Sequence, residues 1–307
     1  MARSFEAFVA ARFPQSRMVP LSGTNNDVYR VTNDDGSVVV KLVTDGDIPL
    51  EYLVEVTRVV ARRLPTQAVR EIHAACHAEP FDAVVSDYIE GVDLAAVLGS
   101  DAAGSLDRAA IASFLVDFLD AMLEVPPLRP GFGLYKRKAP PFATHSEFIE
   151  HYARRYWNRS RSFFDDRVQR TVDRWIDGGF AAATIDDQAF GVTAIDANLK
   201  NFIVTANGSL VVLNVPIVGL SSIAHAVGAI SVNLRHHPER DLFLSEVARR
   251  RPEVRLDLVP HFELWNMLGL LSFYADRHPD RPQTWRNFGS PRPLRDDFMT
   301  HLDQHFP

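Results

Sequence analysis

Apolar and polar residues alternate along much of the first hundred residues with the two-residue period of β-strands, and two segments there show helical spacing instead. The turn Asn33-Asp34-Asp35-Gly36 stands between two apolar alternations, and an Asp-Gly turn in this place predicts a β-hairpin. The expected strands are residues 21–31, 37–43 and 83–89, and the expected helices are residues 4–14 and 49–64. This part of the chain therefore predicts a small sheet with accompanying helices.

Beyond residue 90 the apolar positions recur mainly at helical spacing. The expected helices are residues 106–123, 145–164 and 167–176 and most of the chain after residue 218, with a Pro- and Gly-rich loop over 126–141 and short strands before 218. A strand-rich part followed by a helical part predicts an α+β fold with two lobes. We place the boundary at Glu90-Gly91, which gives an N-terminal nucleotide-binding lobe of residues 1–90 and a helical C-terminal lobe of residues 91–307.

The composition of the 307 residues is that of a globular protein, with 46% hydrophobic and 23% charged residues. No apolar run has the length of a membrane span, and the N-terminus lacks the apolar core of a signal peptide. The single cysteine, Cys76, fits a reducing compartment, so we expect a cytoplasmic protein without a membrane partner. A net charge of -6 argues against nucleic acid as the main partner.

The segment Ala-Ile-Asp196-Ala-Asn-Leu-Lys200-Asn201-Phe-Ile-Val is the most informative in the chain. An Asp followed by four residues, an Asn and a strand-like run is similar to the catalytic loop of kinases. There the Asp takes the proton of the attacking hydroxyl and the Asn holds a magnesium ion. A second metal-binding Asp normally ends the run, where this chain has Asn214. Lys200 could neutralise the transferring phosphoryl group, or it could simply face solvent.

Lys41 interrupts an apolar strand, where an ammonium group is costly unless it meets an anion or reaches solvent at a sheet edge. In kinases a Lys in this place binds the α- and β-phosphates of ATP and pairs with a helix Glu. Glu51 and Glu55 lie one turn apart on the following helix, and we prefer Glu55 because apolar residues flank it on both sides. The polar turn with Gly23 and Asn26 could bind phosphate oxygens through its amides, or it could be an ordinary hairpin turn.

Four motifs, in order, carry a family resemblance. They are Gly23-x-x-Asn-x-Val-Tyr-Arg-Val, Val39-Val-Lys, Asp87-Tyr-Ile-Glu-Gly-Val-Asp-Leu and Asp196-x4-Asn. With this order and spacing, residues 20–225 resemble the aminoglycoside phosphotransferase and choline-kinase-like family. The resemblance implies a two-lobed, protein-kinase-like fold with ATP in the cleft between the lobes.

The resemblance also implies roles for individual residues, with ATP and Mg²⁺ as cofactors. The backbone of Asp87 and Ile89 would receive adenine, and Tyr88 would lie beside it. The other implied site residues are Gly23, Asn26, Lys41 and Glu55 for the nucleotide, Asp196 and Lys200 for catalysis, and Asn201 and Asn214 for the metal.

The chain departs from the family pattern in three places. Ala194-Ile195 stands where the family usually has His-Gly, and His225 stands where an Asp-Leu-Ala often begins. Both positions mainly brace the loop. The third departure is Asn214, where the family usually has Asp. It removes a negative charge from the metal site, and magnesium affinity should fall because this hard cation is usually held by carboxylates.

Two functions fit these observations. The first is an ATP-dependent O-phosphotransferase that acts on a hydroxyl of a small molecule, such as an antibiotic, or of a biosynthetic peptide. The second is a pseudokinase-like binding subunit that recognises a peptide or protein partner, with a lyase in one version, and transfers no phosphoryl group. Lys41 and Asp196 together favour the enzyme. The candidate substrate helices carry as many Arg as acidic residues, so we expect a neutral or acidic acceptor.

Overall fold

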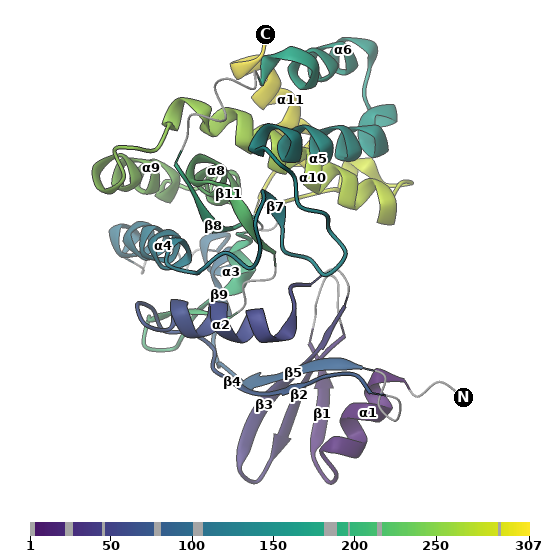
Figure 1. Ribbon diagram of the computed structural model, residues 1–307, viewed down its shortest axis with the longest axis vertical. Coiled ribbons are helices and arrows are strands. Elements are labelled where there is room, and N and C mark those ends of the chain that lie inside the picture. Colours follow the sequence, from purple (N-terminus) through teal and green to yellow (C-terminus); the bar gives the residue numbers. More distant parts are fainter. Residues whose placement is uncertain are drawn as a thin grey trace.

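The computed structural model describes residues 4–21, 27–44, 47–76, 81–100, 107–180, 189–195, 197–213, 217–287 and 290–307. The chain forms a small lobe built on a five-stranded sheet and a larger lobe that is mostly helical (Figure 1). This confirms the α+β arrangement expected from the sequence. Among the described residues, no helix is both long enough and apolar enough to cross a membrane.

The small lobe is an antiparallel sheet between two helices. Its strands, in the spatial order β1-β2-β3-β5-β4, are β1 (Arg17–Pro20), β2 (Val28–Asn33), β3 (Gly36–Val43), β5 (Asp82–Asp87) and β4 (Val69–His73). Helix α1 (Phe5–Arg12) packs its Phe5 and Phe8 on one face of the sheet. Helix α2 (Leu50–Val60) covers the other face and shares its core with the larger lobe (Figure 1).

The larger lobe is organised around α10 (Val259–Arg277), which packs against α5, α8 and α11. The other helices are α3 (Leu94–Leu98), α4 (Arg108–Leu123), α5 (His145–Ser160), α6 (Asp166–Arg174), α8 (Ile223–Asn233), α9 (Glu239–Arg250) and α11 (Leu294–His305). Local sequence fixes where several of them begin. Thr144 and Glu147 form a capping box at the start of α5, and Asp107 caps α4.

Two small sheets lie between the helices and the small lobe. One contains β6 (Val92–Asp93), β9 (Phe202–Val204) and β10 (Leu210–Val212), and the other contains β7 (Gly133–Leu134), β11 (Val218–Ser222) and β8 (Phe190–Ala194). The first sheet also connects the lobes, because Gln67 donates its backbone N–H to the carbonyl of Val212 at 2.8 Å. These short strands hold the segments on either side of the predicted catalytic loop.

The predicted hairpin is confirmed as β2 and β3, and Gly36 in its turn has a φ of +128°, which favours glycine. The helices expected over 106–123, 145–164 and 167–176 are confirmed as α4, α5 and α6. Strands β1 and β4 and the short helix α3 were not predicted. Neither β1 nor β4 has a clear apolar alternation, and each forms because a neighbouring strand supplies its hydrogen bonds.

A buried polar network lies in the core of the larger lobe. His145 Nε2 and His225 Nδ1 both contact the hydroxyl of Ser221, at 2.9 and 2.7 Å. The His225 ring packs against Phe262 and Trp265, with ring centroids 4.9 and 4.6 Å away. Burial lowers the pKa of His145 to about 3 and lowers that of His225 well below its ordinary value. Both imidazoles are therefore neutral in the folded protein.

Gly228 permits the close packing of α8 on α10. A Cβ at this position would lie 2.6 Å from the Cβ of Phe262, and the Phe262 backbone is also in contact. We expect Gly228→Ala to lower the free energy of unfolding by about 1–3 kcal/mol because the two helices must separate. Urea denaturation measures the change. Gly178→Ala is the control, since no heavy atom would lie within 4 Å of its Cβ. Equal stability of the two variants would contradict this packing.

The histidine network predicts a loss of stability in acid. An unfolded histidine has a pKa near 6.5, so the unfolded chain binds more protons than the folded one once the pH falls below that value. The stability that this network contributes is fully present above about pH 6.5 and is lost as the pH falls towards 3. The slope is at most about 1.4 kcal/mol per pH unit for each histidine.

Urea unfolding between pH 7 and 4 tests this expectation. His145→Gln is the comparison, because the amide has a reach similar to that of Nε2 towards Ser221 and does not titrate in this range. The variant should lose stability less steeply than the unmodified chain, by about the contribution of one histidine. Parallel profiles would show that His145 is not held neutral by the fold.

Candidate functional site

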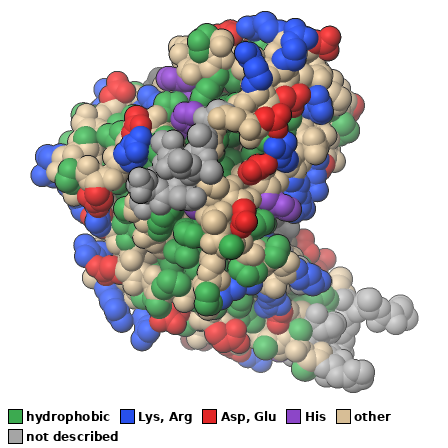
Figure 2. Space-filling model, turned by 45° about the horizontal axis from the view of Figure 1, so that its top comes forward, with side chains coloured by type: hydrophobic (Ala, Val, Ile, Leu, Met, Phe, Trp, Pro, Cys, Tyr) green, Lys and Arg blue, Asp and Glu red, His purple; other side chains and the backbone are tan. Residues whose placement is uncertain are grey.

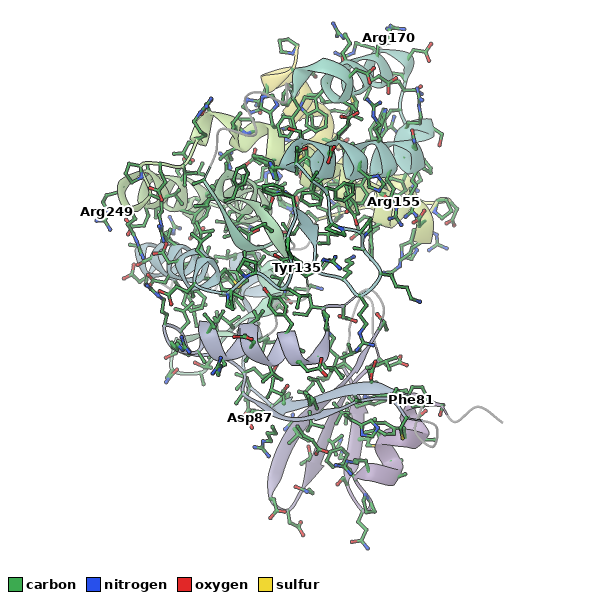
Figure 3. The ribbon with its side chains drawn as sticks, in the orientation of Figure 1. Phe81, Asp87, Tyr135, Arg155, Arg170 and Arg249 are labelled. Atoms are coloured by element: carbon green, nitrogen blue, oxygen red, sulfur yellow. The ribbon has the colours of Figure 1, made fainter. Side chains whose placement is uncertain are left out.

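The described residues of the predicted site come from four parts of the fold. Lys41 lies on β3 and Glu55 on α2. Asp87 ends β5 and is followed by Tyr88 and Ile89, and the segment between β8 and β9 carries Lys200 and Asn201. Figure 3 shows Asp87 on the small lobe and Tyr135 between the two lobes. Four predicted site residues lie outside the described residues, namely Gly23, Asn26, Asp196 and Asn214.

Lys41 lies in the middle of the small sheet and forms an ion pair with Asp47. Its neighbours across the sheet are Val28 on β2 and Val84 on β5. The Lys41 Nζ lies 3.2 Å from Asp47 Oδ1, and both side chains are largely buried, at 16% and 14% exposure. Asp47 is held in turn by the backbone N–H and hydroxyl of Thr44, which donate to Oδ2 at 2.8 and 2.9 Å. The Asp47 carboxylate therefore supplies the negative charge that a largely buried ammonium group requires.

The predicted pairing of Lys41 with a glutamate of α2 is not formed. Glu55 Oε1 lies 3.3 Å from a guanidinium nitrogen of Arg58 on the same helix, and Glu51 is exposed. Asp47 was not predicted, because it lies in the loop before the helix on which an acidic partner was expected. The acidic stretch Asp45-Gly46-Asp47 directly after the strand was the available signal.

At the end of β5, one backbone carbonyl already accepts a hydrogen bond. The Asp87 carbonyl accepts from Gln67 Nε2 at 2.6 Å, and its N–H donates to Ala68 at 2.9 Å. A carbonyl has a second lone pair, so this bond still leaves room for one more donor. The backbone N–H of Ile89 makes no hydrogen bond to any other described residue. The segment thus offers one acceptor and one donor.

Tyr88 packs against the sheet. Its backbone N–H donates to the Ser37 carbonyl at 3.3 Å, and the guanidinium carbon of Arg30 lies 3.9 Å from the centre of its ring. This is within the range of a cation–π contact. The ring is therefore held by β2, and the predicted position of Tyr88 beside adenine stays a prediction.

Backbone hydrogen bonds fix the segments on both sides of Asp196 and Asn214. The Ile195 N–H donates to the Ile217 carbonyl at 2.8 Å, and the Leu213 N–H donates to the Asn201 carbonyl at 2.8 Å. The side chain of Asn198 accepts from the Lys200 N–H at 3.0 Å and shapes the turn between them. Ile195 precedes Asp196 and Leu213 precedes Asn214, and each is therefore held by a backbone hydrogen bond to the other part of the site.

Of the two residues predicted to hold a magnesium ion, Asn201 is among the described residues. Its side chain makes no hydrogen bond to another described residue, so its amide oxygen is available to a metal. Amide and carboxylate oxygens are suitable ligands for Mg²⁺. Within the described part of the chain, no group of three or more His, Cys, Asp or Glu side chains could hold a metal. Lys200 is exposed on the same turn.

A loop from the larger lobe also reaches this region, and the sequence analysis did not assign it a role. The Tyr135 N–H donates to the Val218 carbonyl at 2.8 Å, directly after the segment that contains Asn214. Two residues later, Arg137 forms an ion pair with Asp82 of the small lobe. Burial would raise the pKa of Asp82, but the Ala75 N–H and the Arg137 guanidinium outweigh it and lower the pKa. This ion pair joins the two lobes.

Comparison with known proteins gives the family. The family model described as the phosphotransferase enzyme family matches residues 18–213. No curated protein matches the sequence.

Three solved structures illustrate the likeness in fold. A thermostable mutant of aminoglycoside phosphotransferase APH(4)-Ia, solved with AMP-PNP and hygromycin B, is 17% identical with a TM-score of 0.67, over 99% of this chain and 97% of that one. A mutant of aminoglycoside 2'-phosphotransferase-IIIa with GDP is 13% identical with a TM-score of 0.68, over 98% and 97%. Choline kinase LicA from Streptococcus pneumoniae is 13% identical with a TM-score of 0.62, over 97% and 98%. The chain therefore has the two-lobed protein-kinase-like fold and belongs to the phosphotransferase enzyme family.

Proposed function

We propose that the protein is an ATP-dependent O-phosphotransferase that acts on a hydroxyl of a small molecule or of a biosynthetic peptide. The observation that carries this proposal is the buried ion pair of Lys41 and Asp47 in the central strand of the small sheet. A largely buried ammonium group that pairs with a carboxylate can exchange part of that contact for the phosphates of a nucleotide. Membership of the phosphotransferase family supports the same reaction.

The proposed roles follow the fold. Lys41 would bind the α- and β-phosphates, with Asp47 positioning its side chain and the amides around Gly23 and Asn26 adding contacts. The carbonyl of Asp87 and the N–H of Ile89 would receive the adenine edge. Asn201 and Asn214 would hold Mg²⁺, which would offset the negative charge of the phosphates.

In the proposed reaction, the acceptor hydroxyl attacks the γ-phosphorus of ATP while its proton passes to the carboxylate of Asp196. The bond from the γ-phosphorus to the oxygen that it shares with the β-phosphate breaks, and ADP leaves. Lys200, exposed on the same turn, would attract the transferring phosphoryl group. Such a positioned base and cation act mainly in the transition state, so they should affect turnover more than binding.

The charges on the larger lobe support an acceptor that is not polycationic. Figure 2 shows Lys and Arg side chains intermixed with Asp and Glu on the face that it presents. Arg154, Arg159 and Arg167 of α5 and α6 each pair with a carboxylate, so their charges are balanced. A site for several ammonium groups requires an excess of carboxylates, which these helices do not provide. This balance supports a neutral or anionic acceptor.

Lys41→Ala tests the nucleotide site. The unmodified protein should gain thermal stability from ATP with Mg²⁺, because binding to the folded state stabilises it. The variant should bind ATP at least about 10-fold more weakly, since one close phosphate contact of a cation is lost. Isothermal titration calorimetry measures the affinity, and Arg155→Ala on the exposed side of α5 is the control. Unchanged affinity in Lys41→Ala would contradict the proposed site. Stabilisation by ATP that does not depend on Mg²⁺ would favour a binding subunit without transfer.

Asn214→Asp tests the metal site. A carboxylate at this position would add one negative charge beside the proposed Mg²⁺ ion, so Mg²⁺-dependent ATP affinity and phosphoryl transfer should both rise. The matched control is Asp196→Asn, which should lower turnover about 100-fold or more and change ATP affinity little, because a general base acts in the transition state. ATP affinity and transfer are measured over a series of Mg²⁺ concentrations. If Asn214→Asp and the unmodified chain agree at every concentration, position 214 does not hold the metal.

A further inference from the structure

Gln67 stands just before β4, and the proposed function gives it no role. Its backbone N–H donates to the Val212 carbonyl of β10 at 2.8 Å. Its side-chain amide reaches the Asp87 carbonyl, with 2.6 Å between Nε2 and the oxygen. Because a carbonyl oxygen only accepts hydrogen bonds, the NH₂ end of the amide faces it. One residue thus links the β9–β10 hairpin to the segment that is predicted to receive adenine.

The backbone around Gln67 is held from both sides, independently of its side chain. Val212 accepts from Gln67 and donates its own N–H to the Pro65 carbonyl at 2.9 Å, and its side chain is buried in the core. Directly after Gln67, the Ala68 carbonyl accepts from the Asp87 N–H at 2.9 Å. The amide of Gln67 therefore extends from a fixed point beside Asp87, which lowers the entropic cost of its contact.

The peptide group between Asp87 and Tyr88 is anchored at both of its polar atoms. Gln67 donates to its carbonyl, and its N–H, which belongs to Tyr88, donates to the Ser37 carbonyl of β3 at 3.3 Å. In a planar trans peptide the C=O and N–H bonds point in opposite directions. The two hydrogen bonds, one towards β4 and one towards β3, therefore fix the orientation of this peptide plane.

Of the contacts that hold this peptide, the one from Gln67 acts on the carbonyl most directly. The side chain of Asp87 pairs with Arg70, but Arg70 is 56% exposed, and an exposed ion pair contributes little. The Arg30 guanidinium restrains the ring of Tyr88 and not the peptide group. The Gln67 bond is also shorter than the bond from the Tyr88 N–H, at 2.6 against 3.3 Å. Its removal should thus free the peptide to turn over.

The orientation of this peptide decides which purine the segment can accept. A carbonyl at Asp87 suits the 6-amino group of adenine, which donates, while the Ile89 N–H suits the acceptor N1. A 6-oxopurine has an oxygen at position 6, and this oxygen would face the carbonyl oxygen with no hydrogen between them. With the peptide turned over, the Tyr88 N–H would replace the carbonyl, and the 6-oxopurine would fit better than adenine.

We propose that Gln67 is a positioning residue that makes the nucleotide site selective for adenine over 6-oxopurines, because it holds the Asp87 carbonyl in the orientation that accepts the 6-amino group. The proposal rests on the proposed function, since it concerns the nucleotide of that same site. Gln67 acts through the Asp87 carbonyl and does not itself contact the base. Its effect should therefore appear in the preference between bases more than in the affinity for the phosphates, which both nucleotides share.

The test compares ADP with inosine diphosphate (IDP), which has an oxygen at position 6 and a hydrogen on N1, in the presence of Mg²⁺. Isothermal titration calorimetry measures both affinities for the unmodified chain, for Gln67→Met and for Gln283→Met. Methionine keeps the length of the side chain and the backbone bond to Val212 but removes the donor, and Gln283 is an exposed glutamine of the larger lobe. We expect the unmodified chain to prefer ADP at least about 10-fold, and Gln67→Met to lose about 10-fold of this preference because ADP binds more weakly and IDP more tightly.

The ratio of the two affinities separates positioning from a general defect. A variant that is only less stable binds both nucleotides more weakly by the same factor, so an unchanged preference in Gln67→Met would overturn the role of this residue. Equal binding of ADP and IDP to the unmodified chain would overturn the selectivity, as would an equal loss of preference in Gln283→Met. If the unmodified chain binds neither nucleotide, the proposed function fails together with this proposal. ADP binding with an unchanged preference overturns this proposal alone.

Discussion

The pairing of three short strands, β7, β11 and β8, is the constraint on which the candidate site depends. Strand β8 leads into the predicted catalytic loop, β11 follows the segment with Asn214, and β7 leads into the loop of Tyr135 and Arg137. The backbones approach so closely that a Cβ at Gly219 would lie 2.3 Å from the Gly133 carbonyl oxygen. Only glycine allows this distance, so Gly219 permits the close pairing of β7 with β11.

The burial of charge is the second constraint. An ammonium group in the central strand of the small sheet requires an anion, and Asp47 supplies it from a loop that Thr44 holds in place. The arrangement differs from a lysine paired with a helix glutamate, because the partner lies ahead of α2. The orientation of Lys41 thus depends on the loop between β3 and α2. The apolar side chains of α2 pack in the core that it shares with the larger lobe.

Contacts between the lobes explain how the parts of the site stay together. Gln67 is hydrogen-bonded to Val212 through its backbone and to the Asp87 carbonyl through its side chain, so one residue joins the β9–β10 hairpin to the predicted adenine segment. On the other side, Arg137 pairs with Asp82. The hydroxyl of Tyr52 on α2 donates to the Pro126 carbonyl at 2.8 Å. These bonds hold the small lobe against the larger lobe at several separate points.

Local signals in the sequence determined a large part of this protein. The Asp-Gly turn specified the β2–β3 hairpin because only a few residues accept its backbone angles, and the capping box specified the start of α5 because its bonds lie within four residues. The ordered motifs around Lys41, Asp87 and Asp196 were enough to indicate the family and the fold.

Contacts between distant segments were decided only by the tertiary structure. Asp47 and Glu55 both follow Lys41 closely in the sequence, so either could be its partner. The position of α2 on the sheet decides which carboxylate forms the ion pair. The strands β1 and β4 have too little apolar alternation to be recognised in the sequence. Each forms because a neighbouring strand, β2 or β5, supplies its backbone hydrogen bonds. The strands β7 and β8 are far apart in the sequence, and each pairs with β11, which brings them into one sheet. Such pairings carry no local signal because the energy that fixes them comes from the partner strand.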